Sequence, residues 1–101
     1  MEWVLVAKLT DIKKQGARII ETPKGNIALF RTVQDEIFAL LDKCPHKQGL
    51  LSQGLVHGKK VTCPLHSWVI ELETGHAVAP DMGCVRKFAT KVENGSIFLQ
   101  I

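Results

Sequence analysis

The chain has 101 residues, of which 46% are hydrophobic and 23% are charged, and its formal net charge at pH 7 is +3. These values are ordinary for one globular domain, which we expect to cover residues 1–101. Its apolar runs are too short to cross a bilayer, and its basic residues are too scattered for nucleic-acid binding. The chain also opens without a signal-like segment, so we expect a cytoplasmic location with no membrane and no nucleic-acid partner.

Short β-forming segments separated by turn residues follow one another along the whole chain. Turn signals stand at Pro23-Lys24-Gly25, at Gly58-Lys59 and, most strongly, at Asn94-Gly95. Helical periodicity is lacking beyond a turn or two at residues 11–15. The pattern therefore predicts an all-β, antiparallel protein. Its strands are expected at residues 3–7, 17–22, 26–32, 36–41, 54–57, 60–63, 68–72, 86–93 and 96–101.

Four residues with metal-binding side chains lie in two short loops of this pattern. The first loop carries Cys44 and His46, the second carries Cys63 and His66, and a proline follows each cysteine and stiffens the loop. Zinc accepts two Cys and two His, but usually with like residues paired in sequence. A Rieske [2Fe–2S] centre instead has two Cys on one iron and two His on the other. One Cys and one His per loop favours the iron–sulfur centre over zinc or over unligated residues.

The sequences around these residues, CPHKQG at 44–49 and CPLHSW at 63–68, resemble the two cluster loops of the Rieske family. The resemblance covers the whole chain. It implies a β-sandwich or barrel base with a small cluster-binding subdomain at about 44–83. It also implies one [2Fe–2S] cluster per chain, bound by Cys44, His46, Cys63 and His66, with Pro80 in a third loop that covers it.

The downstream segment APDMGCVR, residues 79–86, resembles a particular subgroup, the small subunit of assimilatory NAD(P)H-dependent nitrite reductase. The subgroup implies electron transfer within a complex that reduces nitrite to ammonium, with a large subunit holding flavin and sirohaem as partner. The alternative is a free-standing Rieske ferredoxin that carries electrons from a flavoprotein reductase to a terminal ring-hydroxylating dioxygenase. A third possibility is a structural module that holds zinc or nothing.

A cluster with four protein ligands leaves no open site for substrate, so electron transfer is the expected role. Outside the cluster, no Ser, Cys or carboxylate is recognisably paired with a base. We therefore expect no catalytic residues and no catalytic site in this chain; it would serve as an electron-transfer subunit of an oxidoreductase.

The residues that flank the ligands predict a low reduction potential. In Rieske proteins of cytochrome bc complexes each ligand loop carries an extra Cys, and the two form a disulfide. Gly49 and Leu65 occupy those positions here. The hydroxyl donors of those proteins also lack clear counterparts, and fewer donors to the cluster mean a more negative potential.

We expect structural or surface roles for the remaining cysteine, histidines and lysines. Cys84 is left over after the ligands are assigned and is expected to be a small buried hydrophobe. His57 and His76 are expected in exposed turns. Four lysines flank the ligand loops and form either a solvated surface or a docking face for an acidic partner. They are Lys43, Lys47, Lys59 and Lys60.

Overall fold

A computed structural model describes residues 2–44, 49–64 and 67–101 of the chain. Over these residues the protein is built from β strands and two single-turn 3-10 helices, so the predicted all-β class is confirmed. The elements in chain order are β1 (Trp3–Lys8), η1 (Leu9–Asp11), β2 (Ala17–Thr22), β3 (Gly25–Arg31), β4 (Ile37–Leu41), η2 (Leu51–Gln53), β5 (Leu55–His57), β6 (Lys60–Thr62), β7 (Val69–Glu71), β8 (Lys87–Phe88), β9 (Thr90–Glu93) and β10 (Ser96–Gln100).

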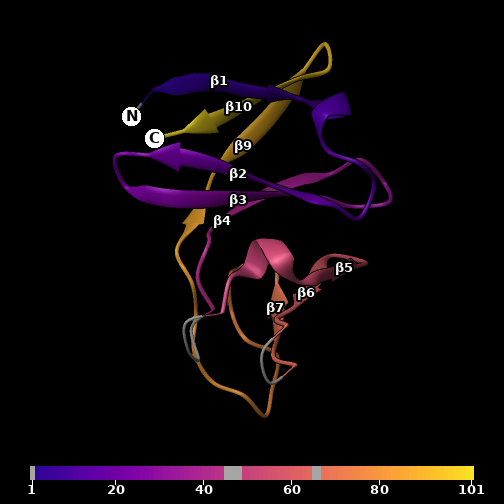
Figure 1. The fold of residues 1–101 in the computed structure, drawn as a ribbon, viewed down its shortest axis with the longest axis vertical. Helices are drawn as coiled ribbons and strands as arrows, with labels where there is room; N and C mark the ends of the chain where they lie inside the picture. Colours follow the sequence, from indigo (N-terminus) through magenta and orange to yellow (C-terminus); the bar gives the residue numbers. More distant parts are fainter. Residues whose placement is uncertain (1, 45–48, 65–66) are drawn as a thin grey trace.

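The strands form three antiparallel sheets, with the orders β1-β10-β9, β2-β3-β4-β8 and β5-β6-β7. Figure 1 shows the first two sheets in the upper part of the molecule and β5-β6-β7 below them. The first and last strands pair, so both ends of the chain lie at the same sheet, far from β5-β6-β7. The upper sheets thus form a base that carries the third sheet.

Strand β3 is buried on both faces and separates two cores. Ile27 and Leu29 pack in a core with side chains of β1 and β10. Ala28 and Phe30, on the opposite face, pack in a second core with side chains of β5, β6 and β7. Successive residues of a strand point to opposite faces, and all four are fully buried. The apolar run Ile27–Phe30 therefore packs against the base with one face and against the third sheet with the other.

One predicted strand, at residues 86–93, is wrong as a single element. The chain forms β8, which pairs with β4, and then β9, which pairs with β10 in another sheet. Ala89 lies between them, and its carbonyl accepts a hydrogen bond from the Gln100 N–H at 3.0 Å. The two strands are not separated by a glycine or a proline, so the β-forming composition of this segment predicted one continuous strand.

The hairpin between β9 and β10 forms as its sequence predicts. Asn94 and Gly95 have φ values of 51° and 78°. A two-residue turn with both central residues at positive φ matches the twist of the flanking strands. The predicted helical turn at 11–15 is displaced, because the only 3-10 turn described in this region is η1.

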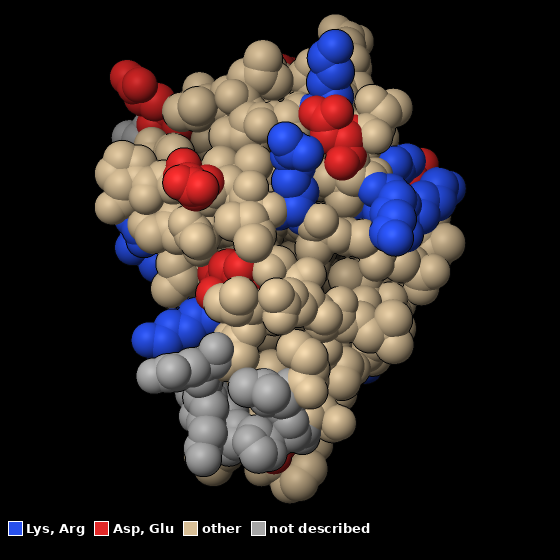
Figure 2. All heavy atoms as spheres, in the orientation of Figure 1, with Lys and Arg blue, Asp and Glu red and all other residues tan. Residues whose placement is uncertain are grey.

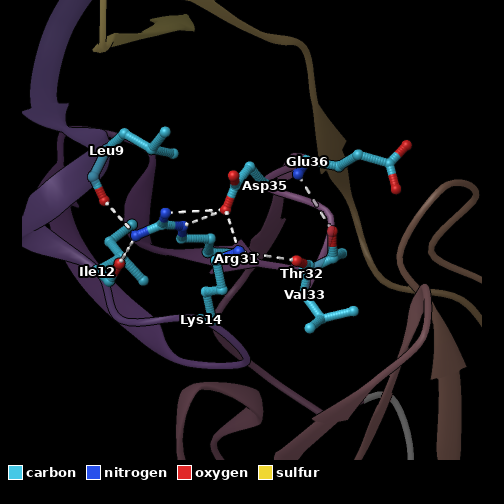
Figure 3. A network of polar contacts seen from close by, with 8 residues as sticks. All are labelled: Leu9, Ile12, Lys14, Arg31, Thr32, Val33, Asp35 and Glu36. Carbon is cyan, nitrogen blue, oxygen red and sulfur yellow. Dashed lines mark hydrogen bonds and ion pairs between the residues drawn. The ribbon is translucent and has the colours of Figure 1, made fainter.

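A polar network centred on Arg31 ties the end of β3 to the segment after β1 (Figure 3). The guanidinium donates to the carbonyl oxygens of Leu9 and Ile12, at 3.2 and 2.7 Å. It also donates to the Asp35 carboxylate from two nitrogens, at 2.8 and 3.1 Å. This hydrogen bonding holds the pKa of Asp35 below its ordinary value, assisted by the charge of Lys14.

The described residues hold no helix long and apolar enough to span a membrane.

Candidate metal centre

The structure brings the two predicted cysteine ligands into one core. Cys44 and Cys63 are 2% and 1% exposed, and both belong to the second core, with Leu51 and Ile70 among its members. No disulfide joins the three cysteines of the chain. The predicted ligands His46 and His66 lie outside the described residues. Two buried sulfurs in one core, with a histidine close behind each in sequence, fit the donor set of a mixed Cys and His cluster.

Both ligand loops are closed by the same backbone hydrogen bond. The Cys44 N–H donates to the Gly49 carbonyl at 2.8 Å, and the Cys63 N–H donates to the Trp68 carbonyl at 2.7 Å. Each bond joins a cysteine to the residue five positions later, so each predicted histidine falls within a closed six-residue loop. The two loops therefore have equivalent closing hydrogen bonds, although one follows β4 and the other joins β6 to β7.

Hydrogen bonds of Asp42 connect the two ends of the first ligand loop. Its carboxylate, in a residue only 6% exposed, accepts hydrogen bonds from the Ser52 N–H at 2.8 Å and from the Ser52 hydroxyl at 2.7 Å. Its own N–H donates to the Asn26 carbonyl at 2.8 Å. Asp42 precedes Cys44 by two residues and Ser52 lies in η2, so these bonds connect both sides of the loop. Nothing in the local sequence pattern singled out this pair.

A third segment leads from β7 back to β8 in the base. The N–H groups of Ala77 and Val85 donate to the carbonyls of Gly83 and Gly75, at 2.9 and 2.8 Å. Gly75 has a φ of 79°, and a Cβ at this position would collide with the Val85 carbonyl oxygen. Pro80, the predicted covering proline, is exposed in this segment and follows a cis peptide bond. Close backbone packing at Gly75 therefore holds the segment in place.

Cys84 is exposed, so the expectation of a buried residue is wrong. Its neighbour Val85 occupies the buried side and packs in the second core, which turns Cys84 and Arg86 outward. Cys84 lines a hollow of about 340 Å³ together with Lys43, Cys44 and Arg86. An exposed thiol and two basic side chains thus lie beside a buried cysteine ligand candidate.

The other predicted histidines differ from each other. His57 is half-buried at the end of β5, with its Nε2 2.6 Å from the Thr62 hydroxyl oxygen on β6, so the exposed position expected for it is wrong. His76 is exposed, as expected, and forms an isolated β-bridge with Cys84. His57 is engaged with its neighbouring strand, and neither histidine is in the core that holds Cys44 and Cys63.

The described lysines among those predicted to flank the loops differ in their surroundings, and Lys60 is exposed. The Lys59 ammonium is bound to the carboxylates of Glu36 and Glu73, at 3.4 and 3.2 Å, and hydrogen bonds to these two groups raise its pKa. Lys43 lines the hollow beside Cys44, whereas Lys47 lies outside the described residues. Figure 2 shows basic and acidic side chains interspersed over the upper part of the visible face.

A family model for the Rieske [2Fe–2S] domain matches residues 2–89 of the chain. The chain belongs to the Rieske family. Its cofactor is accordingly a [2Fe–2S] cluster, which the two buried cysteines in closed loops fit. The sequence-based recognition of the family and its fold is confirmed.

The proteins similar to this Rieske domain include dioxygenase ferredoxins and nitrite reductase small subunits. The ferredoxin subunit of 3-phenylpropionate/cinnamic acid dioxygenase from Photorhabdus laumondii is 33% identical, and the match covers all of this chain and 96% of that protein. The structure of the nitrite reductase [NAD(P)H] small subunit from Erwinia carotovora has a TM-score of 0.80 and 28% identity, covering 98% of this chain and 81% of that one.

A third relative shows the fold alone. The ferredoxin of carbazole 1,9a-dioxygenase from Nocardioides aromaticivorans has a TM-score of 0.87 at 24% identity, covering 98% of this chain and 97% of the other. Proteins of both groups share the whole architecture. The Rieske family model supports electron transfer through a [2Fe–2S] cluster as the function of this chain, and the fold does not separate the two groups.

Proposed function

We propose that this Rieske domain is the electron-transfer small subunit of an NAD(P)H-dependent nitrite reductase, which reduces nitrite to ammonium. The observation that carries the proposal is the segment Gly83-Cys84-Val85-Arg86. Its sequence resembles that of the nitrite reductase subgroup, and in the fold it lines the hollow beside Cys44. The Erwinia carotovora small subunit, similar over nearly the whole chain, supports the same assignment.

The ligand set belongs to the proposal. Cys44 and Cys63 would hold one iron of the cluster, and His46 and His66 would hold the other. When bound, the cluster supplies one-electron transfer. The second core buries both cysteines, and one backbone hydrogen bond closes each ligand loop.

The partner in this proposal is a large subunit that holds flavin and sirohaem, and the location is the cytoplasm. The chain would act as one domain, residues 1–101, in which residues 44–83 form the cluster-binding subdomain. The sheet β5-β6-β7 lies within that range and contributes much of the core around the cysteines. The chain would have no catalytic site of its own, since its cluster only passes electrons to the partner.

The second candidate is a ferredoxin that carries electrons from a flavoprotein reductase to a ring-hydroxylating dioxygenase. The similarity to the Photorhabdus laumondii ferredoxin subunit favours it. The ferredoxin subunit of anthranilate 1,2-dioxygenase from Burkholderia cepacia, 37% identical over 74% of this chain, points the same way. This function needs only transient docking, whereas the first needs a lasting complex.

Reconstitution separates the two candidates. The cluster-loaded protein is mixed with the large nitrite reductase subunit of the same organism, and nitrite consumption is measured with NAD(P)H as reductant. We expect a complex that survives gel filtration and nitrite reduction that the Cys63→Ser chain does not support. Absence of a complex, together with electron delivery to a ring-hydroxylating dioxygenase, would establish the ferredoxin function instead.

A further inference from the structure

The hollow beside Cys44 has basic walls. Lys43 and Arg86 line it from two segments that lie 43 positions apart in sequence and run side by side, since the Leu41 N–H donates to the Arg86 carbonyl at 2.8 Å. Cys84 is exposed in the same hollow, and Cys44 lies at its buried side. The hollow thus opens at the surface next to a cysteine of the ligand set.

The positive charges of this hollow are not neutralised within the protein. All ten carboxylate side chains are among the described residues, and none lies within ion-pair distance of Lys43 or Arg86. The nearest carboxylate in sequence, Asp42, is turned toward Ser52. Arg86 instead lies over the Phe88 ring at 4.9 Å from its centroid, a contact that keeps its charge and steadies its position.

Unlike Lys43, several lysines elsewhere in the protein are paired with carboxylates. Lys14, Lys59 and Lys91 each lie within 4 Å of a carboxylate. Lys59, which the sequence grouped with Lys43, shares its charge between two glutamates. Of the described lysines predicted to flank the ligand loops, Lys43 and Lys60 have no carboxylate within ion-pair distance, and Lys43 shares its hollow with a second cation, Arg86.

We propose that the hollow between Lys43 and Arg86 is the docking site for an acidic side chain of the protein that exchanges electrons with this domain. Two cationic side chains line the hollow and attract a carboxylate, and the planar guanidinium can bind it through two nitrogens. Complementary charge at an interface sets its orientation and speeds encounter. A partner docked here is oriented against the Cys44 side of the cluster domain.

The inference rests on the proposed electron-transfer role, and its test does not require the natural partner. The probe is the acidic peptide acetyl-(Glu)6-amide, coupled to the cluster-loaded protein with a carbodiimide at low ionic strength, where surface charges are least screened. The carbodiimide joins carboxylates to lysine amines without a spacer, and mass spectrometry then measures the yield at each lysine. Lys13 and Lys60 are exposed, have no described carboxylate partner, and serve as reference positions.

We expect coupling at Lys43 to exceed that at the reference lysines by about two- to fivefold, the range for an exposed ion pair. Arg86→Gln should return Lys43 to the reference level. Arg18→Gln, the matched control on the exposed face of β2, should leave Lys43 unchanged. Visible absorbance checks that each variant keeps its cluster, and Arg86→Ala replaces Arg86→Gln if it does not.

Equal coupling at all exposed lysines would overturn the inference, and so would equal effects of the Arg86 and Arg18 variants. The outcome is independent of the nitrite reductase proposal. If the large subunit fails to bind but Lys43 is coupled selectively, the proposed function is wrong and the docking site stands. If the large subunit binds and Lys43 is not selected, the docking site is wrong and the proposed function stands.

Discussion

The carboxylate of Asp42 accepts two hydrogen bonds from Ser52, one from its backbone N–H and one from its hydroxyl. The two residues are ten positions apart, and the loop that begins at Cys44 lies between them. Because Asp42 is almost fully buried, these bonds form away from water, where an unpaired donor is costly. The pair holds the start of the loop against η2.

Asp42→Ala should therefore lower the free energy of unfolding by about 1–3 kcal/mol, because two donors of the half-buried Ser52 lose their acceptor. It should also loosen the first ligand loop, so that less iron is retained after purification. Urea denaturation and iron analysis measure the two effects. Asp42→Asn keeps the shape and should cost less, and equal losses in both variants would contradict the role of the hydrogen bonds.

Gly75 and Gly95 test whether close packing holds the third segment. Their φ values, 79° and 78°, are nearly equal, so alanine suffers the same backbone strain of about 1–2 kcal/mol at either position. A Cβ at Gly75 meets the Val85 carbonyl, whereas a Cβ at Gly95 meets nothing within 4 Å. Gly75→Ala should thus destabilise the protein clearly more than Gly95→Ala in urea denaturation. Equal destabilisation would show that the backbone at Val85 moves aside to accommodate the added Cβ.

The ligand assignment predicts opposite results at two cysteines. Cys63→Ser should abolish cluster assembly, because Cys63 is buried in the core that also holds Cys44. Cys84→Ser should assemble a normal cluster, since Cys84 is exposed and lies outside the motif. Iron content and the EPR spectrum of the dithionite-reduced protein measure both. A normal Rieske spectrum from the Cys63 variant would disprove the ligand set.

The reduction potential should lie at the lower end of the Rieske range, at about −150 to 0 mV. Gly49 and Leu65 exclude the inter-loop disulfide of high-potential relatives, and the chain has no tyrosine to donate a hydrogen bond. At such a potential we expect little pH dependence near neutrality. A potentiometric titration returning about +200 mV would refute the prediction. A slope of about 59 mV per pH unit across neutral pH would contradict its second part.

The Arg31 network predicts how acid affects stability. The pKa of Asp35 is held below its ordinary value of 3.8, first by the Arg31 hydrogen bonds. A lowered pKa contributes stability above the ordinary value, and that stability is lost as pH falls through the folded value. Asp35→Asn keeps a residue that tolerates the positive φ of 65° at this position but removes the charge.

Wild type should consequently be more stable than the Asp35→Asn variant at pH 6, and the difference should shrink on acidification below about pH 4. Thermal denaturation at several pH values measures it. A difference that does not change with pH would show that charge is not what Asp35 contributes.

The strand pattern was readable because each strand is short, apolar on at least one side and bounded by turn residues. Residues 17–22 were predicted to the residue, and the Asn94-Gly95 turn formed as expected. The prediction went wrong at residues 86–93 and at Cys84. In both cases the deciding factor was the neighbour in space. Strand β8 pairs with β4, whereas β9, after Ala89, pairs with β10 in another sheet, and Val85 takes the buried position that Cys84 was expected to occupy.

The sequence alone determined the family and the cofactor, because the spacing of Cys and His within short loops is a local property. It also determined the strands, since alternation and turn chemistry are local too. Only the tertiary structure decided that Cys44 and Cys63 share one core, that Asp42 reaches Ser52, and that Lys59 is neutralised while Lys43 and Arg86 are not. These relationships join residues distant in sequence, and the packing of three sheets is what brings them together.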